Sequence, residues 1–350
     1  MRSSLKLQLR LHTLLQRIKG DFSDIERVRL EHVAPVEQPL VLISQVNRSG
    51  GTLLAQLFAG HPDCHAHPGE LHIGHPKNDY WPTLDLSASS ASWLRQLFED
   101  RLPQYARDGF SKMPDRRRPE MDRSELFFPF LFSRHLMSKI FEQSVSTREI
   151  RTQRDVLDCY HTAYFNAWLD YQGLYTPKKY LVGFTPHLSS REASVEGYFH
   201  DYPDGRLISI VRDPKAWWVS LRAKKPDQRL DARVSLPRWK ASTAAALANR
   251  ERYGERVYLL SFERLLRETE ATMRDLAAHL GIEFHESLLR PTFQNMSIGA
   301  NSSFSSGAKK GAVNEAPLKR ASQLSREESA RIDDEVGALY ETALKQTAGA

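Results

Sequence analysis

The sequence predicts an α/β fold of three layers, with a central, mainly parallel sheet and an inserted helical cap. Two observations lead to this prediction. Short apolar runs that are bounded by turn residues, which are typical of buried strands, alternate with segments of helical periodicity. The alternation begins at residue 39 and recurs to residue 281. Because strands that are joined through helices form parallel sheets, we expect the sheet to be mainly parallel.

The predicted elements follow in chain order and set the expected organisation. Residues 1–38 form an N-terminal amphipathic helix and a linker, and residues 39–350 form one domain with a helical insertion at about 75–175. Strands are expected over 39–44, 180–184, 206–211 and 257–261. Helices are expected over 52–59, 215–224 and 270–280, and within the insertion over 92–104, 126–143 and 156–171. Gly60 and Gly281 follow two of these helices and are typical helix ends.

The composition is that of a folded globular protein, and its charge favours an anionic partner. Of the 350 residues, 41% are hydrophobic and 26% are charged, which is ordinary for globular proteins. The longest apolar runs, such as 207–211, are far shorter than the roughly 20 residues that a membrane span needs. The 49 Lys and Arg residues exceed the 43 Asp and Glu residues, and the net charge is +6. Cys64 and Cys159 are too few for a disulfide scaffold, which favours a reducing, cytoplasmic location.

The first twenty residues resemble a basic amphipathic helix. Basic residues, among them Arg10, Arg17 and Lys19, are interspersed with leucines and Ile18. The segment lacks the uninterrupted apolar core and the cleavage site of a signal peptide. Two interpretations are open: residues 1–20 lie peripherally on an anionic membrane, or they pack within the chain or against another subunit with their charges in solvent.

A glycine-containing loop lies between the first strand and the first helix of the domain. From Gln45 its sequence is QVNRSGGTLL. Glycines let backbone N–H groups approach an anion, and the helix N-terminus adds its positive dipole end. Compared with the triphosphate-binding pattern G-x-x-x-x-G-K-[ST], Gly50 and Thr52 are kept, but Gln45 replaces the first Gly and Gly51 replaces the Lys. Arg48 supplies a cation at the centre of the loop instead.

This loop makes the expected fold P-loop-like, with a donor other than a nucleoside triphosphate. Without the Lys that reaches the β- and γ-phosphates, a triphosphate would lack its main charge partner. A smaller phosphate or a sulfate-bearing donor fits better. A turn with no ligand is the alternative, since strand-to-helix turns are rich in glycine for steric reasons.

A second basic segment follows the strand expected over 206–211. Asp213 is a plausible N-cap with Pro214 at the first helical position, so that Arg212 lies at the carboxyl end of the strand, where open α/β sheets bind ligands. Ser220 and Lys224 lie one helical turn apart on the same face. Together these side chains would suit a phosphate monoester. The alternative is an arginine paired with a nearby carboxylate at an ordinary helix start.

Taken together, the two segments resemble the sulfotransferases that use 3′-phosphoadenosine 5′-phosphosulfate (PAPS). The resemblance is carried by the strand and loop up to NRSGGTLL and by the strand that ends in VRDP, about 160 residues later. It is closest in style to the Golgi-type carbohydrate and protein-tyrosine sulfotransferases and their bacterial relatives. Two departures concern the surroundings of the donor: Gly51 stands where the family usually has Thr or Ser, and Phe262 where Tyr is common.

The resemblance implies a set of donor-binding residues. Those implied to cradle the 5′-phosphosulfate are Arg48, Ser49, Gly50, Gly51, Thr52 and Leu53. Those implied to hold the 3′-phosphate are Arg212 and Ser220, with Lys224 beside them. Lys310 and Gly311 are expected to cover the nucleotide from the C-terminal side.

A histidine-rich string over 61–75 is the third chemical feature. Five histidines with Cys64 could suggest zinc, but the string contains Pro62 and Pro68 and has no H-x3-H pair on a continuous helix, so no metal site is predicted. The resemblance implies that Glu70 is the general base. A histidine takes this role in the cytosolic branch of the family, and His72 or His67 is therefore the second candidate.

The expected function is in-line transfer of a sulfuryl group from PAPS to an acceptor hydroxyl, which leaves adenosine 3′,5′-bisphosphate. Arg48 would meet the charge on the leaving oxygen, a carboxylate would take the hydroxyl proton, and no metal would be required. The expected partner is a carbohydrate, lipid-linked or aryl acceptor, and no nucleic acid is expected. A P-loop kinase or NTPase and a non-catalytic anion- or membrane-binding module are the alternatives. Neither the acceptor nor the oligomeric state follows from the sequence.

Overall fold

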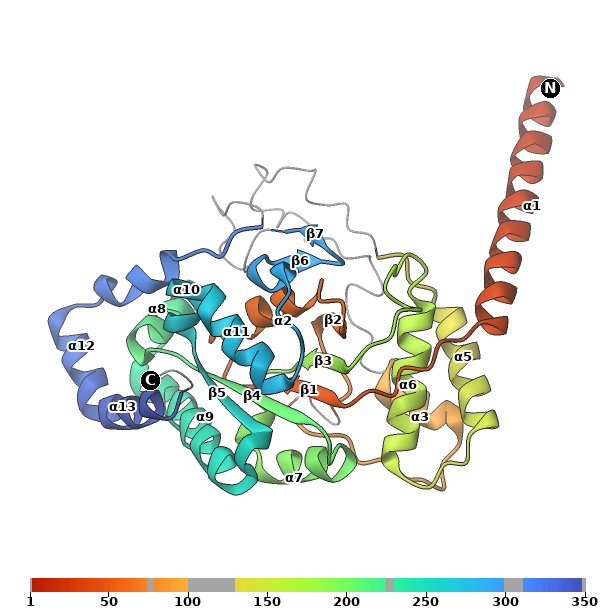
Figure 1. The fold of residues 1–350 in the computed structure, drawn as a ribbon. Coiled ribbons are helices and arrows are strands. Elements are labelled where there is room, and N and C mark those ends of the chain that lie inside the picture. Colours follow the sequence, from red (N-terminus) through yellow and green to blue (C-terminus); the bar gives the residue numbers. More distant parts are fainter. Residues whose placement is uncertain (1, 75–78, 100–129, 225–229, 299–310, 348–350) are drawn as a thin grey trace.

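The computed structural model describes residues 2–74, 79–99, 130–224, 230–298 and 311–347 (Figure 1). Its centre is a five-stranded sheet in the order β2-β3-β1-β4-β5, in which every pair of neighbours is parallel. These strands are β1 (Leu40–Ile43), β2 (Cys64–Glu70), β3 (Tyr180–Phe184), β4 (Arg206–Val211) and β5 (Val257–Ser261). A separate antiparallel pair consists of β6 (Thr292–Phe293) and β7 (Met296–Ser297). The predicted parallel sheet is confirmed.

Helices surround this sheet. Before β3 they are α1 (Arg2–Glu31), α2 (Gly51–Phe58), α3 (Ser90–Leu97), α5 (Arg134–Thr147) and α6 (Gln153–Ala167). After β3 they are α7 (Glu192–Asp201), α8 (Pro214–Lys224), α9 (Ala232–Tyr253), α10 (Phe262–Arg267), α11 (Thr269–Leu280), α12 (Arg326–Ile332) and α13 (Ala338–Lys345). Short 3₁₀ helices span Leu188–Ser190, Gly254–Arg256, Glu286–Leu289 and Ala316–Gln323, and a π-helical turn spans Asp333–Gly337.

The strands are apolar on both faces because both faces are covered. In β1, Leu40 and Leu42 pack into a cluster with residues of α3, α5, α6 and α7. The alternate residues Val41 and Ile43 pack on the other side with residues of α2, α10 and α11. This period of two places one helical layer on each face and confirms the predicted three-layer, P-loop-like α/β fold.

Most of the predicted elements are present with bounds that differ by at most three residues. The strands expected over 180–184, 206–211 and 257–261 are β3, β4 and β5. The helix expected over 270–280 is α11, and Gly281 ends it with a left-handed backbone (φ 66°). Asp213 begins α8 as predicted, because its Oδ1 accepts a hydrogen bond from the Lys215 N–H at 2.8 Å.

Some elements were predicted wrongly or not at all. The helix expected over 126–143 begins only at Arg134, since residues 130–133 are extended and Phe132 bridges to Trp168; residues 126–129 lie outside the described part. The helix expected over 156–171 ends at Ala167. The sequence analysis missed α9, whose pattern is interrupted by Pro237, and it missed β2.

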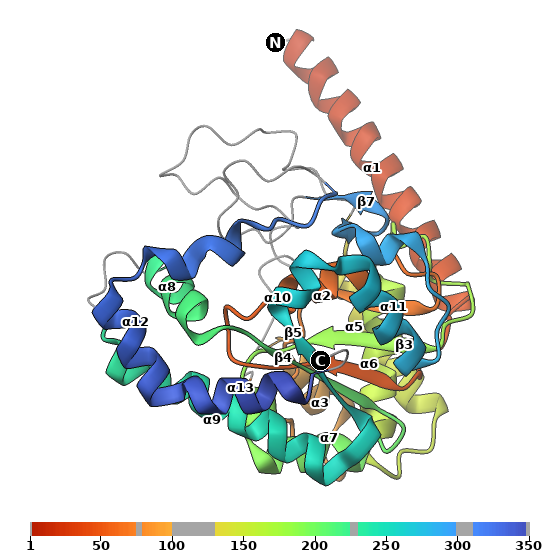
Figure 2. The ribbon, with the colours of Figure 1, turned by 60° about the vertical axis from the view of Figure 1, so that its left-hand side comes forward.

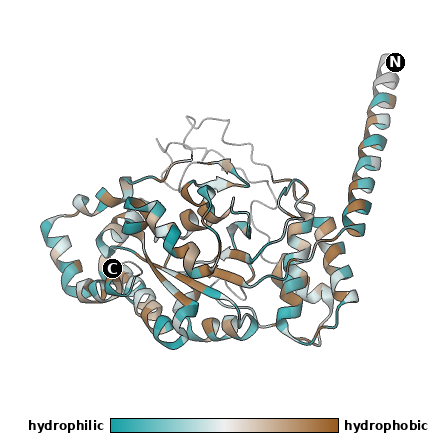
Figure 3. Ribbon diagram, viewed as in Figure 1, coloured by the Kyte–Doolittle hydropathy of each residue, from teal (hydrophilic) through white to brown (hydrophobic). Residues whose placement is uncertain are grey.

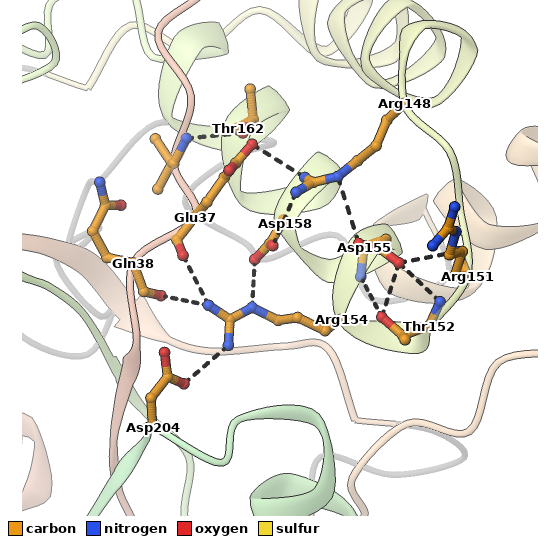
Figure 4. A network of polar contacts seen from close by, with 11 residues as sticks. Glu37, Gln38, Arg148, Arg151, Thr152, Arg154, Asp155, Asp158, Thr162 and Asp204 are labelled. Atoms are coloured by element: carbon orange, nitrogen blue, oxygen red, sulfur yellow. Dashed lines mark hydrogen bonds and ion pairs between the residues drawn. The ribbon is translucent and has the colours of Figure 1, made fainter.

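The insertion between β2 and β3 is joined to the sheet by a polar network (Figure 4). Arg154 of α6 pairs with Asp158 at 2.7 Å and with Asp204, in the turn before β4, at 3.2 Å. It also donates to the backbone carbonyl of Glu37 in the segment before β1, at 2.8 Å. Arg148, which follows α5, pairs with the Glu37 carboxylate at 3.1 Å. The segments before β1 and β4 are therefore held to the same two helices.

The C-terminal segment returns to the middle of the molecule. In Figure 2 it runs from β7 past α8 to α12 and α13, and α13 lies beside α9. Lys215 of α8 pairs with Asp333 at 2.9 Å, and Arg222 pairs with Glu328 at 3.0 Å. The 3₁₀ helix over Ala316–Gln323 is thereby placed against α8.

The N-terminal helix α1 projects from the rest of the chain (Figures 1 and 2). Along it, hydrophobic and hydrophilic residues alternate (Figure 3). None of the helices in the described part of the chain is both long and apolar enough to cross a bilayer.

Candidate functional site

One cavity, of about 490 Å³, lies where the segments that end β1, β2 and β3 meet. Its size suits a small organic ligand. The loop after β1 and the first part of α2 line one side, and the end of β2 lines another. The lining residues are Asn47, Arg48, Gly50, Gly51, Thr52, Ala55, Gln56, Ala59, His67, Pro68, Gly69, Glu70, Phe184, Pro186, Lys224, Thr292 and Phe293. Six residues predicted for the site, Arg48, Gly50, Gly51, Thr52, Glu70 and Lys224, are therefore brought together.

The loop after β1 has no room for side chains at its two glycines. Gly50 has φ +101°, and a Cβ there would lie 2.4 Å from the ring of Phe262. A Cβ on Gly51 would lie 2.2 Å from the ring of Phe184 and 2.3 Å from the side-chain nitrogen of Gln45. The departure from the family pattern at position 51 thus has a steric reason: the side chains of two neighbours occupy the space.

The N-terminus of α2 faces this cavity through its first residues. The first hydrogen bond of the helix runs from the Leu54 N–H to the Gly50 carbonyl at 3.1 Å, and no side chain caps the helix at Gly50. The preceding N–H groups, on Gly51, Thr52 and Leu53, therefore have no acceptor within the helix. Such groups, together with the positive end of the helix dipole, form an anion-binding site.

Arg48 lies at the centre of the loop with a left-handed backbone (φ 69°). Its side chain is half-buried, and burial, with a smaller contribution from Arg320, lowers the pKa of its guanidinium to about 10. The group is still protonated at neutral pH. Its backbone carbonyl accepts a hydrogen bond from Nη1 of Arg212, so the loop is tied to the segment after β4.

Arg212 presents an open edge of its guanidinium. The residue is 2% exposed, and Nε and Nη2 have no hydrogen-bond partner among the described residues. Those two N–H groups form the planar fork that binds two oxygens of a phosphate or sulfate. The guanidinium carbon lies 4.5 Å from the centroid of the Phe262 ring. Burial, opposed by Glu263 and supported by Arg320 and Arg48, lowers its pKa to about 10.

The alternative of an arginine paired with a carboxylate at a helix start does not describe Arg212. No carboxylate in the described ranges lies within ion-pair distance of it. Glu263 instead accepts a hydrogen bond from the Asp213 N–H at 3.1 Å and one from the Tyr340 hydroxyl at 3.3 Å. After burial, the charged groups that change the pKa of Arg212 are Glu263 and Asp213, which raise it, and Arg320 and Arg48, which lower it. Three arginines thus lie close enough to interact, and an anionic ligand would offset their mutual repulsion.

Arg320 is a member of this cluster that the sequence analysis missed. It lies in the 3₁₀ helix over Ala316–Gln323, and its Nη1 donates to Oγ of Ser220 at 2.7 Å. Burial lowers its pKa, and Arg320 in turn lowers the pKa values of Arg48 and Arg212. In the sequence, Arg320 is the second residue of a Lys-Arg pair that follows Lys310 and Gly311, the last residues predicted for the site. Only the return of the C-terminal segment to α8 brings it to the site.

Among the described residues, five predicted donor-binding residues do not line the cavity: Arg212, Ser49, Leu53, Ser220 and Gly311. The hydroxyl of Ser49 is buried without a partner in the described structure, and the side chain of Leu53, a residue of α2, packs in the core. Ser220 is fully buried under Arg320. Gly311 has φ +69° and donates from its N–H to the Ile298 carbonyl at 3.0 Å. Lys310 lies outside the described residues.

Glu70 ends β2 and faces the cavity. It is paired in register with Phe184 of β3, and the register of β2 shifts between Ala66 and Glu70. Its carboxylate makes no hydrogen bond or ion pair to any residue in the described ranges, and burial raises its pKa. An isolated carboxylate with a raised pKa has the properties of a general base.

The two histidines considered as alternative bases are placed differently. His67 lines the cavity, but its Nε2 lies 3.2 Å from Nδ1 of the buried His161. Burial lowers the pKa of His67 to about 3, so this ring is neutral and weakly basic at pH 7. His72 is half-buried and does not line the cavity.

Two further histidines of the string, His61 and His65, have partners of their own, and His75 lies outside the described residues. His61 contacts the Glu283 carbonyl through Nε2 at 2.9 Å, and His65 contacts the Tyr171 hydroxyl through Nδ1 at 2.8 Å. No group of three or more His, Cys, Asp or Glu side chains in the described part of the chain is arranged to hold a metal ion.

The family model described as the sulfotransferase family matches residues 39–286, which include the loop after β1, the end of β2 and the segment after β4. The chain belongs to the sulfotransferase family. This result agrees with the resemblance of the two basic segments, and it makes the kinase or NTPase alternative the less favoured one.

Solved sulfotransferases are similar to this sulfotransferase along most of its length. The sulfotransferase domain of the olefin synthase from Synechococcus PCC 7002 is 18% identical, with 89% of this chain and 95% of that chain covered and a TM-score of 0.47. The sulfotransferase domain from the curacin biosynthetic pathway is 16% identical, with 87% and 99% covered and a TM-score of 0.46. A sulfotransferase from Alicyclobacillus acidocaldarius is 14% identical, with 88% and 97% covered and a TM-score of 0.41. No curated protein sequence matches the chain.

Proposed function

We propose that this sulfotransferase transfers the sulfuryl group of PAPS to an acceptor hydroxyl. The observation that supports it most is the cluster of Arg48, Arg212 and Arg320 next to the glycine loop, in which burial and, to a smaller extent, Arg320 lower the pKa values of the other two guanidinium groups. Cations that are brought together in this way are stabilised by an anion. PAPS carries anionic groups at both ends of its ribose, and the loop and the arginine fork provide one subsite for each.

The residues of the chain fit the two anionic ends of this donor. The N–H groups of Gly51, Thr52 and Leu53 would hold the 5′-phosphosulfate, and Arg48 would stabilise the charge that develops on the bridging oxygen. The free Nε and Nη2 of Arg212 would hold the 3′-phosphate, with Arg320 beside them. The Oγ of Ser220 would hold Arg320 in place by accepting its hydrogen bond. The Ser220 hydroxyl would donate its own proton to the phosphate.

The reaction needs one proton acceptor on the side of the acceptor substrate, and we assign this role to Glu70. The bond between the acceptor oxygen and sulfur forms as the bond between sulfur and the bridging oxygen breaks. The carboxylate of Glu70 takes the hydroxyl proton, and adenosine 3′,5′-bisphosphate leaves with the bridging oxygen. Proton transfer to a positioned base of this kind typically contributes 10² to 10⁴ in rate.

The acceptor is proposed as a small molecule or a glycan with a free hydroxyl. Phe184 and Phe293 line the cavity together with the polar groups of Glu70 and Thr292. Such a wall suits a sugar ring, an aryl ring or the hydroxyl end of a lipid-linked molecule. The transferred sulfuryl group carries less charge than a γ-phosphoryl group, and the proposed site therefore needs no divalent cation for its transfer.

Calorimetry with adenosine 3′,5′-bisphosphate, AMP and ATP tests this proposal. We expect tight binding of the bisphosphate in the presence of EDTA, weaker binding of AMP and weak binding of ATP. Tight binding of ATP that requires Mg²⁺ would favour a kinase or NTPase instead. If the bisphosphate binds but radiolabelled PAPS yields no sulfated product with hydroxyl acceptors, the chain is a nucleotide-binding module without the proposed transferase activity.

A further inference from the structure

Helix α1 (Arg2–Glu31) contacts the rest of the chain only near its C-terminal end, as far as its described side chains show. Glu26 pairs with Lys139 and, at 3.6 Å, with His135 of α5. Arg29 donates to the Leu169 carbonyl at 2.7 Å, and Gln143 donates to the carbonyl of Leu30 at 3.3 Å. Figures 1 and 2 show the remainder of α1 extending away from the domain in both views.

The part that extends carries a row of exposed apolar side chains. These are Leu11, Leu14, Leu15, Ile18, Phe22 and Ile25, which are between 43% and 63% exposed. At about 100° per residue they fall within an arc of roughly 100° on one face of the helix. No residue in the described part of the chain covers this face, and an exposed apolar row of this kind suits a further partner.

The charges on α1 are divided along its length. Residues 2–20 contain five Lys and Arg residues and no Asp or Glu. Arg17 and Lys19 lie on opposite borders of the apolar face, so their long side chains reach the same plane from two sides. The first acidic residue is Asp21, and the other acidic residues follow it toward the domain.

We infer that α1 binds the surface of an anionic lipid bilayer, with its apolar face among the acyl chains and its bordering cations at the headgroups. Over residues 2–20, a row of leucines and Ile18 with basic borders and no acidic residue is the composition of interfacial helices. Each cation near an anionic surface adds to the attraction. The binding anchors the domain to a bilayer through α1 and does not depend on the proposed donor or acceptor.

A second copy of α1 is a poorer partner for this face. Two parallel helices would bring five cations of one against five of the other without any acidic residue between them. An antiparallel pair would place residues 2–12 against residues 21–31, where Arg27 and Arg29 offset two of the four acidic residues and Glu26 is already paired. An anionic bilayer offers charge of one sign along the whole length of residues 2–20.

Vesicle sedimentation of the full chain tests the inference. The probes are vesicles of phosphatidylcholine alone and of phosphatidylcholine with 30% phosphatidylglycerol, in 0.1 M and 1 M NaCl. The test variant is Leu15→Glu with Ile18→Glu, which places two carboxylates on the apolar face. The matched control is Gln16→Glu with Ser23→Glu, which adds the same two charges to the opposite, polar face.

We expect the wild type to sediment with the phosphatidylglycerol vesicles in 0.1 M NaCl and much less with neutral vesicles or in 1 M NaCl. The Leu15→Glu, Ile18→Glu variant should lose at least tenfold in the partition coefficient, and the control should lose clearly less. All three proteins should bind adenosine 3′,5′-bisphosphate or other small ligands alike, because residues 15–23 are far from the cavity. Equal losses in both variants, or a wild type that ignores anionic vesicles, would overturn the inference. So would a wild-type dimer in light scattering that dissociates in the Leu15→Glu, Ile18→Glu variant without any binding to vesicles.

Discussion

Burial has different consequences for the charge on two sides of the candidate site. On one side, formed by the loop after β1, which lines the cavity, and by Arg212, which is hydrogen-bonded to this loop, burial lowers the pKa values of Arg48 and Arg212 to about 10. On the other side, burial lowers the pKa of His67 to about 3 and raises that of Glu70. At neutral pH the arginines keep their charge, whereas His67 is neutral and Glu70 is moved toward its protonated form.

The difference shows why the two sides suit different steps of a reaction. An arginine begins so far above neutral pH that a lowering to about 10 leaves it cationic, and it can bind an anion throughout a reaction. A carboxyl group begins below neutral pH, and burial brings its pKa toward the range where proton exchange is efficient. The same desolvation therefore produces a permanent charge on one side and a group able to exchange a proton on the other.

Glu70→Gln should have the largest effect, because it should lower turnover and leave donor binding unchanged. The substitution keeps the size of the side chain and removes its basicity. We expect turnover to fall by roughly 10² to 10⁴ while the affinity for adenosine 3′,5′-bisphosphate stays nearly unchanged, because the base acts only on the acceptor proton. Steady-state rates with radiolabelled PAPS, combined with calorimetry, measure both quantities.

The pH profile and two further variants complete this test. The wild-type rate should rise with pH through one ionisation that lies above the ordinary Glu value of 4.5, and this rise should be absent in Glu70→Gln. Glu142→Gln, at an exposed position of α5, is the matched control. If Glu70→Gln keeps near-normal turnover while His72→Ala or His67→Ala abolishes it with donor binding intact, a histidine is the base.

Arg212→Ala tests the cationic side. It removes a charged fork whose Nε and Nη2 are unpartnered in the described structure. A hydrogen-bonded contact with a charged group is worth about 1.5 to 3 kcal/mol, so affinity for the bisphosphate should fall roughly ten- to 150-fold. Affinity for AMP, which lacks the 3′-phosphate, should fall much less. Damage to the loop would lower the affinities for both nucleotides by the same factor. If Arg212→Ala leaves the ratio of the two affinities unchanged, another group binds the 3′-phosphate.

Arg320→Gln has a smaller expected effect on the same measurement. The guanidinium is only half-buried and already donates to Ser220, so its loss should weaken bisphosphate binding by roughly two- to tenfold. Lys319→Gln is the matched control, since it removes the same charge from the neighbouring, exposed position. Equal effects of the two variants would mean that Arg320 contributes only to the net charge of the segment.

The smallest effect is on stability. Because burial raises the pKa of Glu70 in the folded state, the folded state binds more protons than the unfolded state between the two pKa values. Stability from this group is therefore lost as pH rises from the ordinary Glu value through the raised one. Glu70→Gln should raise the melting temperature at pH 7, and the gain should disappear below pH 4.5, as thermal melts at both pH values would show. A lower melting temperature of Glu70→Gln at pH 7 would contradict a buried, unpaired carboxylate.

The sequence predicted the sheet well because its strands are buried on both faces. Runs such as Leu40–Ile43 and Arg206–Val211 are largely apolar and continuous, and a short run of this kind between turn residues is typical of a strand inside a parallel sheet. Strand β2 has the opposite character: it lies at the edge of the sheet, contains Pro68 and is rich in histidine. An edge strand with a register shift tolerates a proline, but nothing in the local pattern distinguishes it from a turn.

The candidate site was predictable where it follows a strand and unpredictable where the chain returns from afar. Arg48 and Arg212 each follow a strand of the central sheet, and strand ends meet at one edge. Arg320 lies 100 residues beyond its partner Ser220, in a segment without a strand, and only tertiary packing places it. Thr292 and Phe293, which also line the cavity, were missed for the same reason.

The hydrogen bond from Arg212 to the carbonyl of Arg48 would make the two proposed anion subsites depend on each other. A ligand that orders Arg212 also orders the peptide that carries Arg48, so the entropy cost of ordering the loop arises once for both subsites. A molecule with both anionic groups should therefore bind more tightly than its two separate fragments would suggest. Likewise, a fragment that occupies one subsite should increase the affinity of the other for its own fragment, as linkage requires.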